Sequence, residues 1–166
     1  MRHSQSRALL RWTGKKCGLY PCELELEIDT VLECISDIQH SLVPAWYSHA
    51  CGRSPVTGDF YEATKLSAEQ VAGVFDALNN EILPVRFQQL ENLLSGESRK
   101  SGPYFCGNVL TVADLSAYVL IAGMIDGTYL SGLSTEFVRT CTGLVKLVET
   151  VRALPQVQAW EAQSTK

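Results

Sequence analysis

The chain has 166 residues, of which 46% are hydrophobic and 19% are charged, and its formal net charge is −4. A chain of this length can form one domain, because a domain of this size buries roughly 70% of the surface that its unfolded chain exposes. The acidic balance argues against nucleic-acid binding, which needs a basic surface. No segment approaches the ~20 apolar residues of a membrane span, and the first ten residues do not form a secretory signal.

The six cysteines are scattered along the chain and form no CxxC pair. Their spacing from the three histidines matches no common metal site. We therefore expect buried or idle thiols in a reducing cytoplasm, and no bound metal.

The first predicted element is a helix over 4–17. Its apolar face carries Ala8, Leu9 and Trp12. Gly18 ends this helix, since glycine is the usual residue just beyond a helix C-terminus. The segment 19–21 then predicts a turn into the next helix.

A long helix is predicted from about Glu23 to beyond His40. Its apolar residues recur at steps of three and four, which is the pattern of a helix with one face in a core. They are Leu24, Ile28, Val31, Leu32, Ile35, Ile38 and Leu42. Pro44 should bend or end this helix. The segment 50–66 then predicts a long connection.

Ser67 opens the next predicted helix as its N-cap, and Gln70 completes a capping box. The apolar face of this helix is Val71, Val74, Phe75, Leu78, Ile82, Phe87, Leu90 and Leu94. Pro84 lies within that pattern, so we expect a kink rather than two unrelated helices. A loop is expected over 96–108.

A strong helix-start signal follows this loop. Thr111 is predicted to be an N-cap with Asp114 at the third helical position, and Leu110 can pack on Leu115. The carboxylate also meets the positive end of the helix dipole. The segment 117–125 is apolar nearly all round, which predicts a central, buried helix.

The last predicted elements are a helix over 142–153 and a short final turn that begins at Pro155. The helix directs Leu144, Leu147, Val148 and Val151 inward. Period-two alternation is absent from the chain, so no sheet is expected. The sequence therefore predicts an all-α fold, a bundle of about six helices.

Four segments, in order, resemble the cytosolic glutathione transferases. Residues 105–115, with the run Leu-Thr-Val-Ala-Asp, are similar to the family's helix-start motif. Residues 5–12 resemble the last helix of the family's thioredoxin-like domain, and 18–21 resemble its interdomain linker. Residues 154–160 are similar to the family's closing Leu-Pro-x-Val segment. The resemblance covers almost the whole chain and is nearest to the sigma, mu, pi and alpha group.

The resemblance implies two parts of unequal size. Residues 1–18 correspond to the terminal helix of a thioredoxin-like domain, and 19–166 correspond to the C-terminal helical domain. In this family the thioredoxin-like domain comes first and holds the Tyr or Ser that stabilises the glutathione thiolate. The expected form is therefore truncated, with weak or no activity alone. Tyr20 lies in the linker and is not that hydroxyl.

The resemblance also implies a glutathione site. Gln5 and Ser6 would receive the γ-glutamyl carboxylate at a helix N-terminus, although Ser and Gln are also ordinary residues at a helix start. Glu33 stands where relatives place an Asp that reaches the glutathione ammonium across the dimer. The alternative for Glu33 is a solvated helix face that it shares with Asp29 and Asp37.

The electrophile pocket of relatives implies four more positions here, Gln39, His40, Val43 and Tyr47. As a general base His40 has little support, because a single histidine on a helix is usually a polar neighbour only. Thr111 and Asp114 are expected to form a structural cap, whose loss should cost on the order of 1 kcal/mol or more.

The function that follows from the resemblance is glutathione transfer to small electrophiles in the cytoplasm, with glutathione as co-substrate and a homodimer as the assembly. One alternative is a non-catalytic helical module of the same family that binds another protein. A second is an unrelated helical bundle with a small apolar ligand. Glutathione affinity distinguishes the first alternative from the enzyme.

Overall fold

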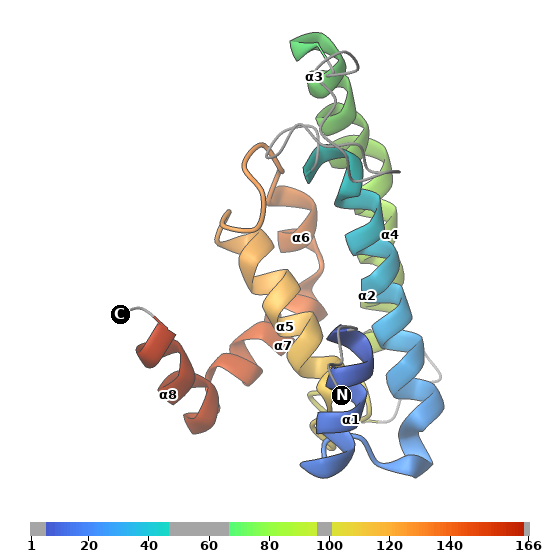
Figure 1. The fold of residues 1–166 in the computed structure, drawn as a ribbon, viewed down its shortest axis with the longest axis vertical. Coiled ribbons are helices and arrows are strands. Elements are labelled where there is room, and N and C mark those ends of the chain that lie inside the picture. Colours follow the sequence, from blue (N-terminus) through green and yellow to red (C-terminus); the bar gives the residue numbers. More distant parts are fainter. Residues whose placement is uncertain (1–5, 47–66, 96–100, 165–166) are drawn as a thin grey trace, which may run out of the picture.

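The computed structural model describes residues 6–46, 67–95 and 101–164, and these residues form a helical bundle (Figure 1). The elements in chain order are α1 (Ser6–Lys16), η1 (Cys22–Leu24), α2 (Glu25–Trp46), α3 (Ala68–Ala77), the π-helical segment η3 (Leu78–Ile82), α4 (Leu83–Ser95), α5 (Val112–Ile125), α6 (Glu136–Thr140), α7 (Thr142–Arg152) and α8 (Pro155–Ser164). Extended backbone in these ranges is limited to isolated bridges between 104 and 109. The predicted all-α bundle is confirmed. None of the described helices is long and apolar enough to span a membrane.

Helix α5 lies at the centre of the bundle, as its apolar sequence predicts. It packs against α2 on one side and α7 on the other, and α4 bridges these two neighbours. Figure 1 shows the long helices α2 and α4 side by side, with α8 projecting to one side near the C-terminus. Nine of the fourteen residues of α5 are buried, but Val119 of the same helix is 58% exposed. The central helix therefore keeps one apolar side chain on an open face.

The apolar face predicted for the second helix is buried throughout; Leu24 lies in η1 and the other residues lie in α2. Pro44 was predicted to bend or end this helix. It does not end it at once, because α2 continues through Pro44 to Trp46. Pro44 is in the last turn, where few following residues depend on its neighbours' hydrogen bonds. The long connection predicted over 50–66 lies outside the described residues.

Helices α3 and α4 form one interrupted helical path (Figure 1). The interruption is a π-helical turn, in which the Leu83 N–H donates to the Leu78 carbonyl five residues back. This turn ends two residues before Pro84, which has no N–H to donate. The prediction that these helices belong together is confirmed. The prediction that Ile82 is inward is wrong: the extra residue of the π turn shifts the register, so Ile82 is 39% exposed and Leu83 is buried.

The C-terminal third contains more helix than predicted. The helix expected over 142–153 is α7. The expected final short turn is instead the ten-residue helix α8, with Pro155 at its first position, where a missing N–H costs nothing. The five-residue helix α6 was not predicted.

Helix α1 docks on the start of α5 through its one buried residue, Gly14. A Cβ at Gly14 would lie 2.7 Å from Cγ1 of Val112, so glycine permits this close approach. The Leu19 carbonyl then accepts from the Val112 N–H at 3.0 Å. The face of α1 that carries Trp12, which is 62% exposed, points to solvent.

Candidate functional site

The start of α5 is fixed by a buried carboxylate. Asp114 is fully buried, and its two oxygens accept hydrogen bonds from the Phe105 N–H at 2.8 Å, the Thr111 N–H at 2.7 Å and the Thr111 hydroxyl at 2.8 Å. Burial raises the pKa of Asp114, and these hydrogen bonds oppose the rise. The capping box that the sequence predicts is present. Asp114 therefore holds the preceding loop and the helix start together.

An ionic cluster joins α1 to α2. Arg11 donates from Nε to Asp29 at 2.7 Å and from Nη2 to Glu33 at 2.8 Å. These hydrogen bonds raise the pKa of Arg11 further. For Asp29, burial would raise the pKa, but hydrogen bonds from Tyr20 and Arg11 outweigh it and lower the pKa. Both carboxylates thus bind one guanidinium, and Asp29 is held ionised by it and by Tyr20.

Tyr20 belongs to the same cluster. Its side chain is buried, and its hydroxyl donates to Asp29 at 2.7 Å. Burial and this hydrogen bond raise the pKa of Tyr20 to about 12. The hydroxyl proton is therefore committed to a carboxylate of its own chain.

A cavity of about 380 Å³ lies between α1, α2 and α5. We call it the α1–α2–α5 cavity. Its walls are Ser6, Arg7, Leu10, Leu32, Ile35, Gln39, Leu115, Ser116 and Val119. It brings together Ser6 and Gln39, two residues that the sequence assigned to neighbouring parts of one site.

Glu33 lies beside this cavity rather than in its wall. It is 2.8 Å from Arg11 and 3.8 Å from Arg7, and Arg7 in turn donates to the Gln39 Oε1 at 3.5 Å. Glu33 also lines a shallow, open groove between α2 and α4. Arg7 thus links the predicted ammonium ligand to the predicted pocket.

Other predicted site residues do not join the cavity. His40 is exposed, and its Nδ1 lies 3.4 Å from the Ser36 hydroxyl. Val43 is half-buried one turn further along α2 and is not in the wall. Gln5 and Tyr47 lie outside the described residues.

The two arginines of α1 were not among the predicted site residues. Arg7 and Arg11 are four residues apart, so they share one helix face. Asp29 and Glu33 have the same spacing on α2, and this match of charges could have predicted that the two helices pair. The contribution of Val119 and its neighbours on α5 has no comparable local signal, because it depends on tertiary packing.

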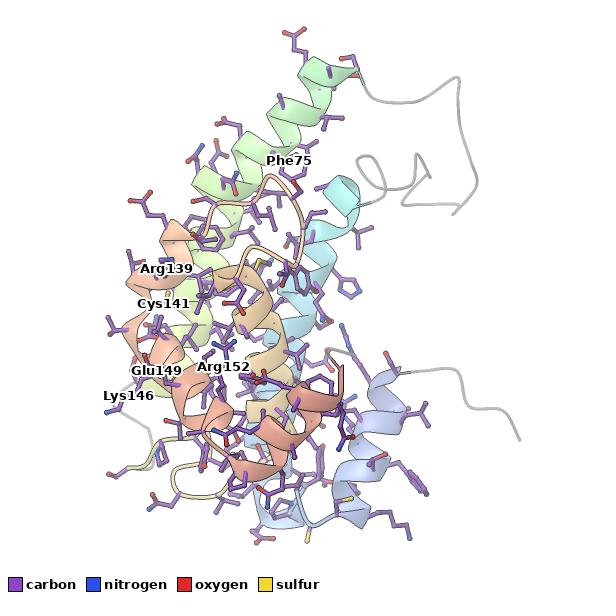
Figure 2. All side chains as sticks on the ribbon, turned by 90° about the vertical axis from the view of Figure 1, so that its left-hand side faces the viewer. Phe75, Arg139, Cys141, Lys146, Glu149 and Arg152 are labelled. Atoms are coloured by element: carbon purple, nitrogen blue, oxygen red, sulfur yellow. The ribbon has the colours of Figure 1, made fainter. Side chains whose placement is uncertain are left out.

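A second, more apolar groove of about 620 Å³ lies between the end of α1, α5 and α8. Its walls are Cys17, Leu19, Leu110, Leu115, Tyr118, Val119, Leu154, Gln156, Val157 and Trp160. In its wall the Tyr118 hydroxyl donates to Glu161 of α8. Arg152, which is labelled in Figure 2, donates from Nε to the same hydroxyl at 3.4 Å. Burial raises the pKa of Tyr118 most, and the hydrogen bond to Glu161 raises it further. These contacts fasten α8 to the bundle and thereby form one wall of the groove.

Comparison with known proteins gives two results that bear on this arrangement. The family described as "Glutathione S-transferase, C-terminal domain" matches residues 56–164. Among solved structures, prostaglandin synthase D of Nilaparvata lugens is similar, with a TM-score of 0.73 and 19% identity over 98% of this chain and 69% of that one. At this identity the likeness is one of fold. No curated protein matches the chain.

Proposed function

Because this chain belongs to the glutathione S-transferase family through the C-terminal helical domain, we propose that it forms binding surfaces for glutathione and for an electrophilic co-substrate. The reaction of the intact site would be addition of the glutathione thiolate to an electrophilic carbon. The observation that carries the proposal is the α1–α2–α5 cavity, whose wall contains both Ser6 and Gln39.

In the proposed binding mode, the charged γ-glutamyl group of glutathione lies at the rim of the cavity. Ser6 begins α1, and the first turn of this helix contains no acidic residue. The backbone N–H groups of this first turn and the Ser6 hydroxyl can donate hydrogen bonds to a carboxylate. Glu33 would receive the ammonium of the glutathione bound by a partner subunit, and its side chain, 60% exposed, is open to a ligand. Because Arg11 already binds this carboxylate, the ammonium would share it.

We also propose that this chain's own residues do not ionise the thiol. A free thiol has a pKa of about 8.5, so only a few per cent is thiolate at neutral pH unless a donor stabilises the anion. Tyr20 donates its proton to Asp29, and Tyr118 donates to Glu161. In this proposal 1–18 are the last helix of a thioredoxin-like domain and 19–166 are the helical domain. The activating hydroxyl belongs to the thioredoxin-like domain, but not to residues 1–18.

The proposed setting is the cytoplasm and the proposed assembly is a homodimer. The open groove between α2 and α4 includes Leu26 and Leu93, which are exposed apolar side chains on neighbouring helices. It also contains Glu33. A partner subunit on this face would bring Glu33 close to a second copy of the site.

Calorimetric titration with glutathione tests the proposal. The chain should give a saturable heat, and Ser6→Ala and Glu33→Gln should each weaken binding about tenfold, since each removes a hydrogen bond to a charged group. Ser95→Ala and Glu149→Gln serve as matched controls on α4 and α7 and should bind as the parent chain does. Absence of heat from the parent chain would refute the proposal. A thiol-conjugation assay should show little turnover.

A second function is a non-catalytic module for protein interaction, and one observation favours it. Trp12, Val119 and Trp160 are each more than half exposed, on α1, α5 and α8. Exposed apolar side chains of this size are typical of protein-binding surfaces when they form a patch. This function predicts partner binding without glutathione affinity, so the same titration separates it from the first.

A further inference from the structure

The α1–α2–α5 cavity combines an apolar wall with a single charge. Five of its nine lining residues are aliphatic, three are polar and uncharged, and Arg7 is the one ionised side chain among the lining residues that the structure describes. Its volume of about 380 Å³ is at the lower end of the roughly 300–1,000 Å³ range of small-molecule sites. A ligand that fills it must therefore be largely apolar and must meet one cation.

The contacts of Arg7 are long for a guanidinium. It lies 3.8 Å from Glu33 and 3.5 Å from the Gln39 Oε1. Arg11 is the closer partner of Glu33, at 2.8 Å. Charge-assisted hydrogen bonds of arginine are normally about 2.7–2.9 Å, and a guanidinium has five N–H donors. Arg7 thus retains donors for another anion.

Gln39 contacts both Arg7 and Tyr129. Its carbonyl accepts from Arg7. Burial raises the pKa of Tyr129, and a hydrogen bond with Gln39 opposes that rise. The amide is therefore held between Arg7 and Tyr129, so that the guanidinium stays near the rim of the cavity.

We propose that Arg7 makes this cavity selective for co-substrates that carry a carboxylate on an apolar chain. The carboxylate pairs with Arg7 and the chain lies on Leu10, Leu32 and Leu115. A neutral ligand of the same shape would cover the guanidinium and remove its water without replacing it, which is unfavourable. A carboxylate matches both the single charge and the planar fork of arginine. The role as co-substrate rests on the proposed function, whereas the binding preference does not.

The apolar wall distinguishes this role from glutathione binding. Glutathione is polar along its whole length, so it gains little from five aliphatic side chains. Arg7 is therefore assigned to the co-substrate, and Ser6 and Glu33 to glutathione. Replacement of Arg7 should change the two affinities differently.

The test compares octanoate with 1-octanol, which has the same chain without the charge, by calorimetric titration of the whole chain. The parent protein should bind octanoate at least tenfold more tightly than octanol. Arg7→Gln should abolish this preference, with octanol and glutathione affinities within twofold of the parent. Arg86→Gln is the matched control, because Arg86 is 38% exposed against 36% for Arg7 and also has a long ion pair, 3.5 Å to Asp37.

A charge reversal keeps the test independent of folding. Arg7→Glu should prefer octylamine over octanoate, a result that a misfolded chain would not give. Equal binding of octanoate and octanol by the parent protein would overturn the proposal. Retained preference in Arg7→Gln, or an equal loss of glutathione affinity, would also overturn it. Failure to bind glutathione at all would refute the proposed function but would leave the octanoate comparison intact.

Discussion

The Asp114 carboxylate accounts for how the central helix begins, and Asp114→Asn tests this account. The side chain accepts three hydrogen bonds within 2.7–2.8 Å in a fully buried position. An asparagine oxygen can keep the two bonds from Thr111 in weaker, uncharged form, but its NH₂ group would then face the N–H of Phe105. One bond to a charged group, worth about 1.5–3 kcal/mol, is lost and a buried N–H is left without an acceptor. Relief from burying the charge offsets part of this, so we expect a net loss of about 2 kcal/mol.

Denaturant unfolding followed by circular dichroism measures this loss at neutral pH. Ser67→Ala is the matched control, because Ser67 forms the same capping box with Gln70 on an exposed helix start. Removal of that cap should cost about 1 kcal/mol or less. If Asp114→Asn is no more destabilising than Ser67→Ala, the buried hydrogen bonds do not hold α5 as described.

Three further predictions concern helix docking, and denaturant unfolding tests each of them. Gly14→Ala should destabilise the fold by about 1–2 kcal/mol, because the added methyl would be 2.7 Å from Val112. Gly73→Ala is the control: a methyl there would meet no atom within 4 Å, so the change should stabilise α3 by about 0.5–1 kcal/mol. Asp29→Asn should be less stable than the parent chain above the ordinary Asp pKa of 3.8. The difference in free energy of unfolding should shrink as pH falls through the lowered pKa of Asp29 in the folded chain. A difference that does not change with pH would contradict this. Glu91→Gln should cost about 1–2 kcal/mol, because both carboxylate oxygens accept backbone N–H groups at the start of α7, at 2.8 and 2.9 Å.

The elements that the sequence predicted well depend on local chemistry. The buried face of α2 follows from spacing alone, and the capping boxes at Ser67 and Thr111 follow from residues three positions apart. Ile82 was misplaced because periodicity assumes a regular α-helix, whereas the π turn before Pro84 adds one residue to the register. The length of α8 was underestimated because its apolar residues are too few to form a clear stripe.

The candidate site could be predicted only in part for a similar reason. Ser6 was proposed from the resemblance and lies in the cavity wall beside Gln39. The cavity itself is made where three helices meet, and Val119 enters it from a helix that reads as uniformly buried. The charge spacing of Arg7 and Arg11 could have predicted that α1 pairs with α2. That Arg7 is the looser partner of Glu33 follows only from the distances, 3.8 Å for Arg7 and 2.8 Å for Arg11.

The central claim is that this chain binds glutathione without ionising its sulfur. The most direct measurement is a pH titration of the glutathione thiol in the presence of saturating protein, followed by thiolate absorbance with the signal of the protein alone subtracted. We predict a midpoint close to that of a free thiol, about 8.5. A midpoint below neutrality would show that residues of this chain activate the thiol, and would contradict the account.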